Sequence, residues 1–253
     1  MDTNKHELNS FLGKLLDGAE VDWKPLGEVL VRTKGTKITA SQMKELHKDQ
    51  APVKLFAGGK TVAFVDYGAI PSRDVNRRAS IIVKSRGNIE FEYYDKPFSH
   101  KNEMWAYHSN NNYINIKYVY YFLRIHEPHF QNLGGRMQMP QISTPDTDKF
   151  SIPIPCPEDP KKSFEIQSEI VRILDTITEL TTELTTELTT ELTTELTNRK
   201  KQYNHYRNQL LSFEDGEVEW KTLGEVGVFR RGTAITKKQT TEPIAKPQRR
   251  NGG

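Results

Sequence analysis

Residues 178–197 read TELTTELTTELTTELTTELT, which is five uninterrupted copies of the unit Thr-Glu-Leu-Thr. The repeat lies inside a longer segment, residues 161–212, that contains no Gly or Pro and is predicted to form one helix. At 1.5 Å per residue this helix is roughly 75 Å long, which is too long for one small domain to cover. The sequence therefore predicts a long helix that needs a partner helix.

An apolar stripe runs along the predicted helix and continues through the repeat. Four residues turn a helix by about 400°, so the leucines drift around its surface by about 40° per unit and do not follow a heptad. We expect this stripe to mediate pairing with a second helix in a homodimer. Its members are Ile166, Ile170, Ile173, Leu174, Ile177, Leu180, Leu184, Leu188, Leu192, Leu196, Tyr203 and Leu210.

Stability does not explain the perfect repetition. Threonine makes up half of the repeat, and it is a poor helix former that costs up to about 0.7 kcal/mol per residue relative to alanine. In-frame slippage of the underlying DNA would add or remove whole units, and each event would change the helix by about 6 Å. We therefore interpret the repeat as an adjustable spacer; the alternative is a surface coiled coil with no adjustable role.

The helix separates two copies of one sequence. Residues 20–42 read EVDWKPLGEVLVRTKGTKITASQ and residues 217–239 read EVEWKTLGEVGVFRRGTAITKKQ, with 14 of 23 positions identical. The chain thus holds one unit of about 200 residues and the opening of a second. A protein built from two such units offers two similar surfaces, and a one-unit version must recover the second surface by pairing with itself.

The pattern along the chain predicts an α+β protein in three parts. Residues 1–157 form a globular domain, and residues 158–213 form the long, coiled-coil-forming helix. Residues 214–253 are the truncated start of a second domain, whose tail is expected to be disordered or to act as a docking strand.

Several local patterns support a globular first part. Runs of β-branched and aromatic residues between turn residues predict strands, and apolar spacing near 3.6 predicts helices. Alternating prolines force an extended strand at the end of the domain. The expected strands are residues 61–66, 79–83, 89–94 and 151–160, and the expected helices are residues 3–17 and 113–125.

Composition is typical of a soluble protein. Hydrophobic residues make up 35% of the chain and the mean hydropathy is −0.69, which allows one core and a large solvated part. No apolar run approaches the ~18 residues of a membrane span, and the first residues do not resemble a signal peptide. The single cysteine, Cys156, cannot form an internal disulfide. We expect a cytoplasmic protein that does not bind membranes.

Positive charge is concentrated outside the repeat. The whole chain carries +3 and the repeat carries −5, which leaves +8 for the remainder. A basic remainder suits a polyanionic partner such as nucleic acid, although solubility alone also accounts for such a charge.

Catalytic and metal-binding motifs are rejected one by one. Residues 56–61 (FAGGKT) end like a phosphate loop, but Lys54 stands where the first glycine is required. His126 and His129 are three residues apart, yet Pro128 disrupts a helical metal pair. Cys156 lies among prolines with no His in register, which argues against a catalytic thiol. We predict no catalytic residue and no metal site: this chain binds rather than catalyses.

Three segments are rich in side chains that bind DNA. They are residues 72–88, a basic run that includes Lys84, residues 99–112 (SHKNEMWAYHSNNN) and residues 134–143 (GGRMQMPQIS). Arg pairs with guanine and Asn or Gln with adenine in the major groove, while Lys and Arg bind phosphates. Singly these are most simply solvated loops, but together they favour DNA reading. The candidate DNA-binding residues are Arg73, Arg77, Arg78, Arg86, Lys101, Asn102, Asn110, Arg136, Gln138 and Gln141.

At this point a family resemblance becomes specific. The chain resembles the specificity subunit of a Type I restriction–modification enzyme, in a half-length form. The resemblance rests on EVDWKPLGEV, SIPIPCPEDP, EIQSEIVRILDTITELT, the TELT repeat, NRKKQYNHYRNQLLSF and EVEWKTLGEV. Residues 50–145 carry only a general likeness. The family pattern has two recognition domains and two helices, and this sequence departs from it by stopping after the first helix.

The resemblance implies a function. Residues 1–157 would be a target-recognition domain that reads one DNA half-site, and paired antiparallel helices would set the gap between half-sites. Partners would be double-stranded DNA, a modification subunit that methylates adenine with S-adenosylmethionine, and a restriction subunit that uses ATP and Mg²⁺. The alternatives are an inactive truncated subunit and a coiled-coil adaptor that binds only protein.

Overall fold

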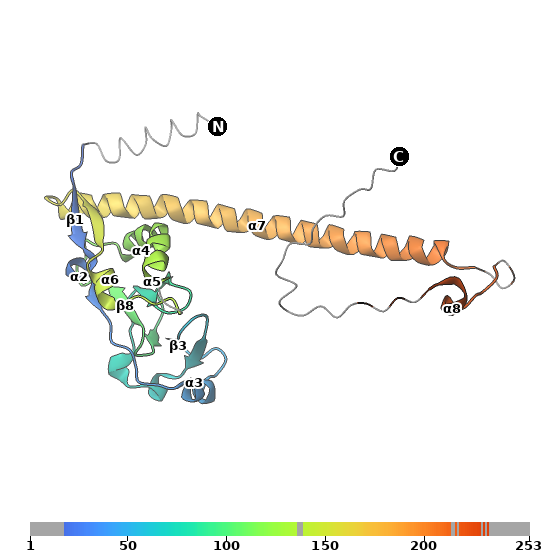
Figure 1. Cartoon of the computed structure of the whole chain (residues 1–253). Coiled ribbons are helices and arrows are strands. Elements are labelled where there is room, and N and C mark those ends of the chain that lie inside the picture. The colour runs from blue at the N-terminus through green and yellow to red at the C-terminus, as the bar shows by residue number, and fades with distance from the viewer. Residues whose placement is uncertain are drawn as a thin grey trace, which may run out of the picture. The chain divides into compact units, whose positions relative to one another are not determined.

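The structure is a computed structural model that describes residues 18–135, 139–213, 216, 218–228, 230 and 232. The helix predicted for residues 3–17 and the predicted tail after residue 239 lie outside this range. The chain divides into two compact units, whose boundary falls inside the long helix α7 (Pro160–Leu210), between Thr186 and Glu187 (Figure 1). Helices and strands are segregated as expected for an α+β protein.

The centre of the first unit is an antiparallel sheet of four strands in the order β2-β8-β5-β6. These strands are β2 (Val31–Arg32), β5 (Ser80–Lys84), β6 (Glu90–Tyr94) and β8 (Trp105–His108). The strands predicted near residues 79–83 and 89–94 are therefore confirmed as β5 and β6. The apolar residues of β5 are fully buried because helices cover one face of the sheet and a second sheet adjoins it.

A smaller sheet has the order β4-β3-β7 and combines antiparallel and parallel pairing. Its strands are β3 (Val53–Phe56), β4 (Val62–Val65) and β7 (Phe98–His100), and β4 confirms the strand predicted for residues 61–66. Helix α3 (Ala40–Leu46) and the 3₁₀ turns η1 (Tyr67–Ala69) and η2 (Ser72–Asp74) complete this lobe. The lobe has its own apolar cluster, centred on Val53, Leu55 and Val65.

Helix α4 (Ile116–Ile125) confirms the helix predicted in residues 113–125. It begins where the Asn115 side chain accepts hydrogen bonds from the backbone N–H groups of Lys117 (3.0 Å) and Tyr118 (3.3 Å). Val119 and Leu123 are fully buried against the central sheet. Two short helices follow, α5 (Glu127–Gly134) and α6 (Thr144–Asp148).

A two-stranded ribbon closes the first unit. Strand β1 (Val21–Pro25) pairs antiparallel with β9 (Ser151–Pro155), so the two ends of this domain meet. The strand predicted among the alternating prolines is therefore confirmed. Helix α2 (Leu26–Val29) follows β1 directly, and the fully buried Leu26 anchors it in the main core.

The first turns of α7 pack onto the globular domain of the first unit. Gln167 is fully buried; its side chain donates to the Tyr113 carbonyl (3.2 Å) and accepts from the Asn115 N–H (2.9 Å). Lys117 and Asp175 form an ion pair at 2.7 Å. Ile166 is only 3% exposed because it is buried against its own chain. It therefore belongs to this internal contact, and the prediction that it faces a partner helix is wrong.

Beyond this contact α7 is exposed. Ile170, Ile173 and Leu174 are partly buried, whereas the leucines of the repeat are each more than half exposed. Threonine hydroxyls along the repeat donate to the carbonyl four residues earlier, as Thr181 does to Ile177 at 2.7 Å. These bonds give the threonine hydroxyls a partner within the helix, although threonine itself is a poor helix former.

The second unit contains the second copy of the sequence that begins at residue 20. Helix α8 (Leu223–Val226) has the sequence LGEV, like α2, and in both helices the residue that follows is extended. In α8, however, Leu223 is 77% exposed, whereas its counterpart Leu26 is fully buried. Among the described residues of the second unit, none forms a strand.

No helix in the described part of the chain is both long and apolar enough to cross a bilayer.

Candidate nucleic-acid interface

The structure places six of the ten candidate DNA-binding residues in two clusters at opposite ends of one strand pair. Strands β5 and β8 are antiparallel, with Ile81 opposite Tyr107 and Val83 opposite Trp105. Arg78 lies just before β5, and Arg86 lies just after it. Eight residues of extended chain span about 26 Å, so one domain presents two separate surfaces and not one continuous patch.

The first surface, which we call the Arg78 cluster, consists of Arg78, Asn110 and the neighbouring residues 109–112. The Arg78 guanidinium donates to the Asn110 side-chain oxygen. An open hollow of about 480 Å³ lies here, and its lining is mostly polar. It is formed by Arg78, Ala79, Ser109, Asn110, Asn111, Asn112, Ile114 and Ile116. Burial lowers the pKa of the adjacent His108, and the charge of Arg78 lowers it further, so this imidazole is neutral near pH 7.

The second surface, which we call the Arg86 cluster, consists of Arg86, Lys101, Asn102 and Gln141. Arg86 donates from Nε (3.2 Å) and Nη2 (2.9 Å) to the Gln141 side-chain oxygen. Lys101 pairs with Glu103 at 2.7 Å. Burial opposes ionisation of Glu103, but the hydrogen bond from Lys101 and the charges of Lys101 and Arg86 outweigh it and lower the pKa of this carboxyl. Polar and charged side chains from three segments therefore converge at this end of the sheet.

Sequence reasoning missed two basic residues beside this cluster. A hollow of about 420 Å³ adjoins Asn102, and Arg32 and Lys34 also line it. Arg32 ends β2 and Lys34 follows it. Because β2 pairs with β8, the sheet brings both residues next to the turn at residues 101–104. No local pattern marked them, because they lie about seventy residues away in the sequence.

Three other candidates are placed differently. Arg73 and Arg77 belong to the segment at the edge of the small lobe, where the Arg77 guanidinium lies over the Tyr67 ring at 5.2 Å. The Arg73 side chain is 88% exposed. Arg136 and Gln138 lie outside the described residues. The role of every candidate in DNA binding stays a prediction.

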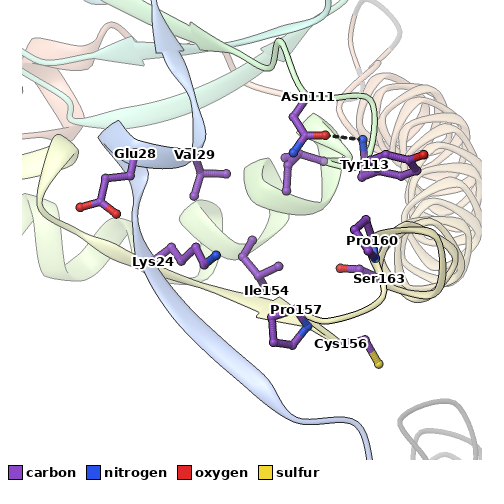
Figure 2. A pocket seen from close by; sticks show the side chains of 11 residues that line it. Lys24, Glu28, Val29, Asn111, Tyr113, Ile154, Cys156, Pro157, Pro160 and Ser163 are labelled. Carbon is purple, nitrogen blue, oxygen red and sulfur yellow. Dashed lines mark hydrogen bonds between the residues drawn. The ribbon is translucent and has the colours of Figure 1, made fainter.

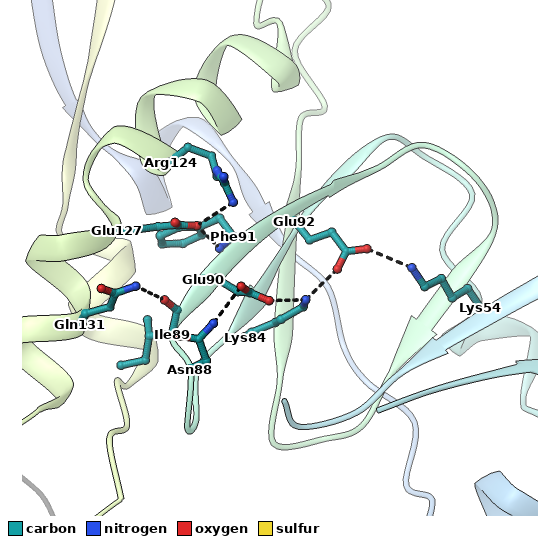
Figure 3. Close-up of polar contacts among 10 residues, drawn as sticks. All are labelled: Lys54, Lys84, Asn88, Ile89, Glu90, Phe91, Glu92, Arg124, Glu127 and Gln131. Carbon is teal, nitrogen blue, oxygen red and sulfur yellow. Dashed lines mark hydrogen bonds and ion pairs between the residues drawn. The ribbon is translucent and has the colours of Figure 1, made fainter. Parts of the chain in front are cut away.

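Two segments proposed as DNA-reading loops are partly structural. Residues 99–112 include strand β8, whose Ala106 and Tyr107 are fully buried, so only the residues flanking the strand are available to DNA. Lys84, in the basic run 72–88, is also committed internally. It pairs with Glu90 at 2.5 Å and Glu92 at 2.9 Å, as Figure 3 shows, and its side chain is 11% exposed. Lys84 therefore stabilises the β5–β6 pair and does not face DNA.

The ion pairs in Figure 3 continue across the two sheets. Glu92 also pairs with Lys54 of β3 at 3.0 Å, which links the small lobe to the central sheet. On the helical side, the Glu127 side chain accepts from the Phe91 N–H at 2.8 Å and holds α5 against β6. These contacts fix the scaffold on which both clusters are mounted.

A third hollow, of about 260 Å³, lies where β9 runs into α7 (Figure 2). Lys24, Ile154, Cys156, Tyr113 and Ser163 are among its lining residues. Cys156 is a half-buried free thiol. The lining mixes apolar and polar groups without the clustered Arg and Asn of the other two hollows, so it is a weaker candidate for binding DNA.

The histidine pair is part of the packing. His126 contacts the Phe122 ring with centroids 4.3 Å apart, and its Nδ1 lies 2.8 Å from the Phe122 carbonyl. Within the described ranges, no group of three or more His, Cys, Asp or Glu residues is arranged to hold a metal ion.

Comparison with known proteins places this architecture in a family. The family model of the Type I restriction modification DNA specificity domain matches residues 21–194. Two relatives come from Escherichia coli. The Type I restriction enzyme EcoR124I/EcoR124II specificity subunit is 40% identical over 232 residues, 91% of this chain and 54% of the relative. The Type I restriction enzyme EcoprrI specificity subunit is 35% identical over 243 residues, 90% of this chain and 59% of the relative.

A solved structure shows the same fold. It is the S subunit of a Type-I restriction-modification system from M. genitalium, with a TM-score of 0.50 and 17% identity, covering 64% of this chain and 40% of that one. The chain spans about half the length of the curated relatives it matches. Because the family model covers more than half of the sequence, the chain belongs to the DNA specificity subunits of Type I restriction–modification systems.

Proposed function

We propose that this chain reads DNA for a Type I restriction–modification complex and that it binds a bipartite, palindromic target as a homodimer. Specificity subunits are the non-catalytic components of these systems, which agrees with a chain whose polar clusters resemble binding surfaces. The observation that carries the DNA-reading proposal is the pair of Arg-and-amide clusters at the two ends of β5 and β8. Arginine and amide side chains are the groups that read base edges.

The exposed stripe on α7 supports pairing between two copies. Leu180, Leu184, Leu188, Leu192 and Leu196 are each 52–65% exposed. Full burial of a leucine side chain is worth roughly 1.5–3 kcal/mol, so a partner that covers half of each would gain several kcal/mol from these five residues. A second copy carries a stripe of the same period, which makes it a suitable partner.

Twofold pairing determines the form of the target. Two identical domains related by a twofold axis read the same half-site on opposite strands, and the stretch between them is left unread. The target is then palindromic, with an unspecified spacer whose length α7 sets.

The remaining components belong to partner subunits. In this proposal a modification subunit binds S-adenosylmethionine and methylates adenine, and a restriction subunit uses ATP and Mg²⁺. In this proposal the partner subunits bind the cofactors, and this chain directs both activities to the target. We place the complex in the cytoplasm, where the DNA of a bacterial cell lies.

Methylome sequencing tests the proposal. The chain is co-expressed with a modification subunit in a host that lacks both, and methylated positions are mapped. We expect one bipartite motif with two identical half-sites, and light scattering should give two copies of the 29.1 kDa chain per complex. Two different half-sites would show that another chain supplies the second domain. The absence of any motif would favour an inactive subunit or a protein-binding adaptor.

A further inference from the structure

The side chains of Arg86 and Gln141 face each other because their backbones are held in register. The two residues form an antiparallel bridge between segments that are far apart in the sequence. On either side of it, the Gly87 N–H donates to the Pro140 carbonyl (2.8 Å) and the Ile142 N–H donates to the Ser85 carbonyl (3.0 Å). The pair is thus a fixed feature of the fold, unlike two mobile surface side chains that meet by chance.

The polarity of the pair limits what it can bind. Two N–H groups of Arg86 point at the single side-chain oxygen of Gln141, so this acceptor is already used. Among the described residues, neither Nη1 of Arg86 nor Nε2 of Gln141 has a hydrogen-bond partner. Both of these nitrogens are donors. The pair therefore offers two donors and little acceptor capacity to a ligand.

This donor pair matches guanine better than adenine. In the major groove guanine presents two acceptors, N7 and O6, whereas adenine presents the acceptor N7 and the donor N6–H₂. A glutamine reads adenine by accepting and donating at once, and Gln141 cannot accept freely while Arg86 occupies its oxygen. An amide side chain ordinarily reads adenine, but at this position we expect Gln141 to favour guanine.

The surroundings supply affinity for the DNA backbone. Lys101, Arg32 and Lys34 lie around the same end of the sheet. Glu103 pairs with Lys101 at 2.7 Å and also interacts with the charge of Arg86, and Asp148 pairs with Arg32 at 3.5 Å. Four basic residues against two acids leave this end of the sheet positively charged. Basic side chains around a donor pair fit a duplex in which phosphates are held at the rim and a base edge lies at the centre.

We propose that Arg86 and Gln141 act as one unit that reads a guanine in the major groove of each half-site. This inference rests on the proposed function, because it requires that the domain reads DNA. It adds the base, the edge of that base and the two residues that recognise it.

Two variants test the unit. Gln141→Glu keeps an acceptor for Arg86 but removes the Nε2 donor, and Arg86→Gln removes the guanidinium. The complex of each variant with the modification subunit is used to select duplexes from a randomised library. We expect both variants to lose preference for guanine at the same base pair, by roughly 5- to 150-fold, while the other positions keep their preference. Arg73→Ala is the matched control, since it removes an exposed Arg that has no amide partner; it should weaken all sequences alike.

A modified base gives an independent readout. Replacing that guanine by 7-deazaguanine removes the N7 acceptor and leaves the pairing edge unchanged. It should weaken binding by the wild-type complex and have little effect on the Arg86→Gln complex.

The outcomes separate the possibilities. A uniform loss of affinity in both variants would identify a phosphate contact and overturn the inference, as would unchanged preferences. A wild-type complex that selects no sequence at all would refute the proposed function itself, and the inference with it. Both residues are exposed, so the variants should fold, and thermal melting that matches wild type confirms this.

Discussion

Removing one Thr-Glu-Leu-Thr unit should shorten the unread spacer of the target without changing the bases read. Because all five units are identical, deleting any one of them gives the same protein, and the residue following Ile177 is still Thr178. Gln167 and Asp175 contact the globular domain before the repeat begins, and Thr178, which interacts with Tyr121, is kept in the shortened chain. The recognition domain and both clusters are therefore unaffected by the deletion.

The helix geometry sets the size of the effect. One unit contributes about 6 Å of rise and a rotation of about 40° beyond a full turn. DNA advances about 3.4 Å per base pair, so the shift equals at most about two base pairs, and part of it is lost to rotation. We expect the spacer to shorten by one or two base pairs. Deleting two units doubles the rotation to about 80°, which should shorten the spacer further or abolish activity.

Methylome sequencing of variants with four, five and six units measures the spacer directly. The matched control replaces the threonines of one unit by alanine, which preserves the length and raises helix propensity. Its spacer should equal that of the wild type. A spacer that stays constant across the length series would show that the repeat is passive and would refute the reasoning from helix rise.

Three further predictions follow from individual contacts. Leu188→Asn combined with Leu192→Asn should weaken self-association at least tenfold in analytical ultracentrifugation, because both side chains lie on the proposed interface; unchanged association would exclude the stripe. Gln167→Ala should lower the free energy of unfolding by about 1–3 kcal/mol, because it leaves a buried N–H without its acceptor; chemical denaturation measures this. Burial lowers the pKa of His100 in spite of the nearby Lys101 carbonyl and Asp74. On acidification, this histidine is therefore protonated at a higher pH in the unfolded chain than in the folded chain. Stability should be complete above about pH 6.5 and fall below it by up to about 1.4 kcal/mol per pH unit, and a melting temperature in wild type no more sensitive to acid than in His100→Asn would contradict this.

Local sequence patterns identified the long helix and part of the domain that precedes it. The strands near residues 62–65, 80–84 and 90–94, the helix 116–125 and the long helix all followed from residue type, period and turn residues. The patterns missed strands β2, β3, β7 and β8 and the short helices α2, α3, α5 and α6. Strand β8 is the clearest case, because its sequence WAYH was assigned to a binding loop. Its burial comes from pairing with β2 and β5, which no local pattern reveals.

The candidate site was harder to predict because residue type does not identify a partner. Lys84 and Arg86 belong to one basic run and are only two residues apart. Lys84 nevertheless pairs with two glutamates, whereas Arg86 pairs with an amide. Similarly, Ile166 shares its spacing with the exposed stripe but is covered by its own domain. Charge and period nominated the candidate residues, and only the tertiary pairing shows what each one contacts.

The position of the internal contacts on α7 explains how recognition and spacing are separated. Every buried residue of α7 lies within its first twelve residues, and the ion pair to Asp175 ends just before the repeat. Because no residue of the repeat is buried against the globular domain, a change in repeat number costs none of the packing that holds the Arg78 and Arg86 clusters in place. A mutation in either cluster, by contrast, leaves the helix unchanged. Under the proposed function, the chain therefore gains a new spacer and a new half-site by independent changes, and each change leaves the other property as it was.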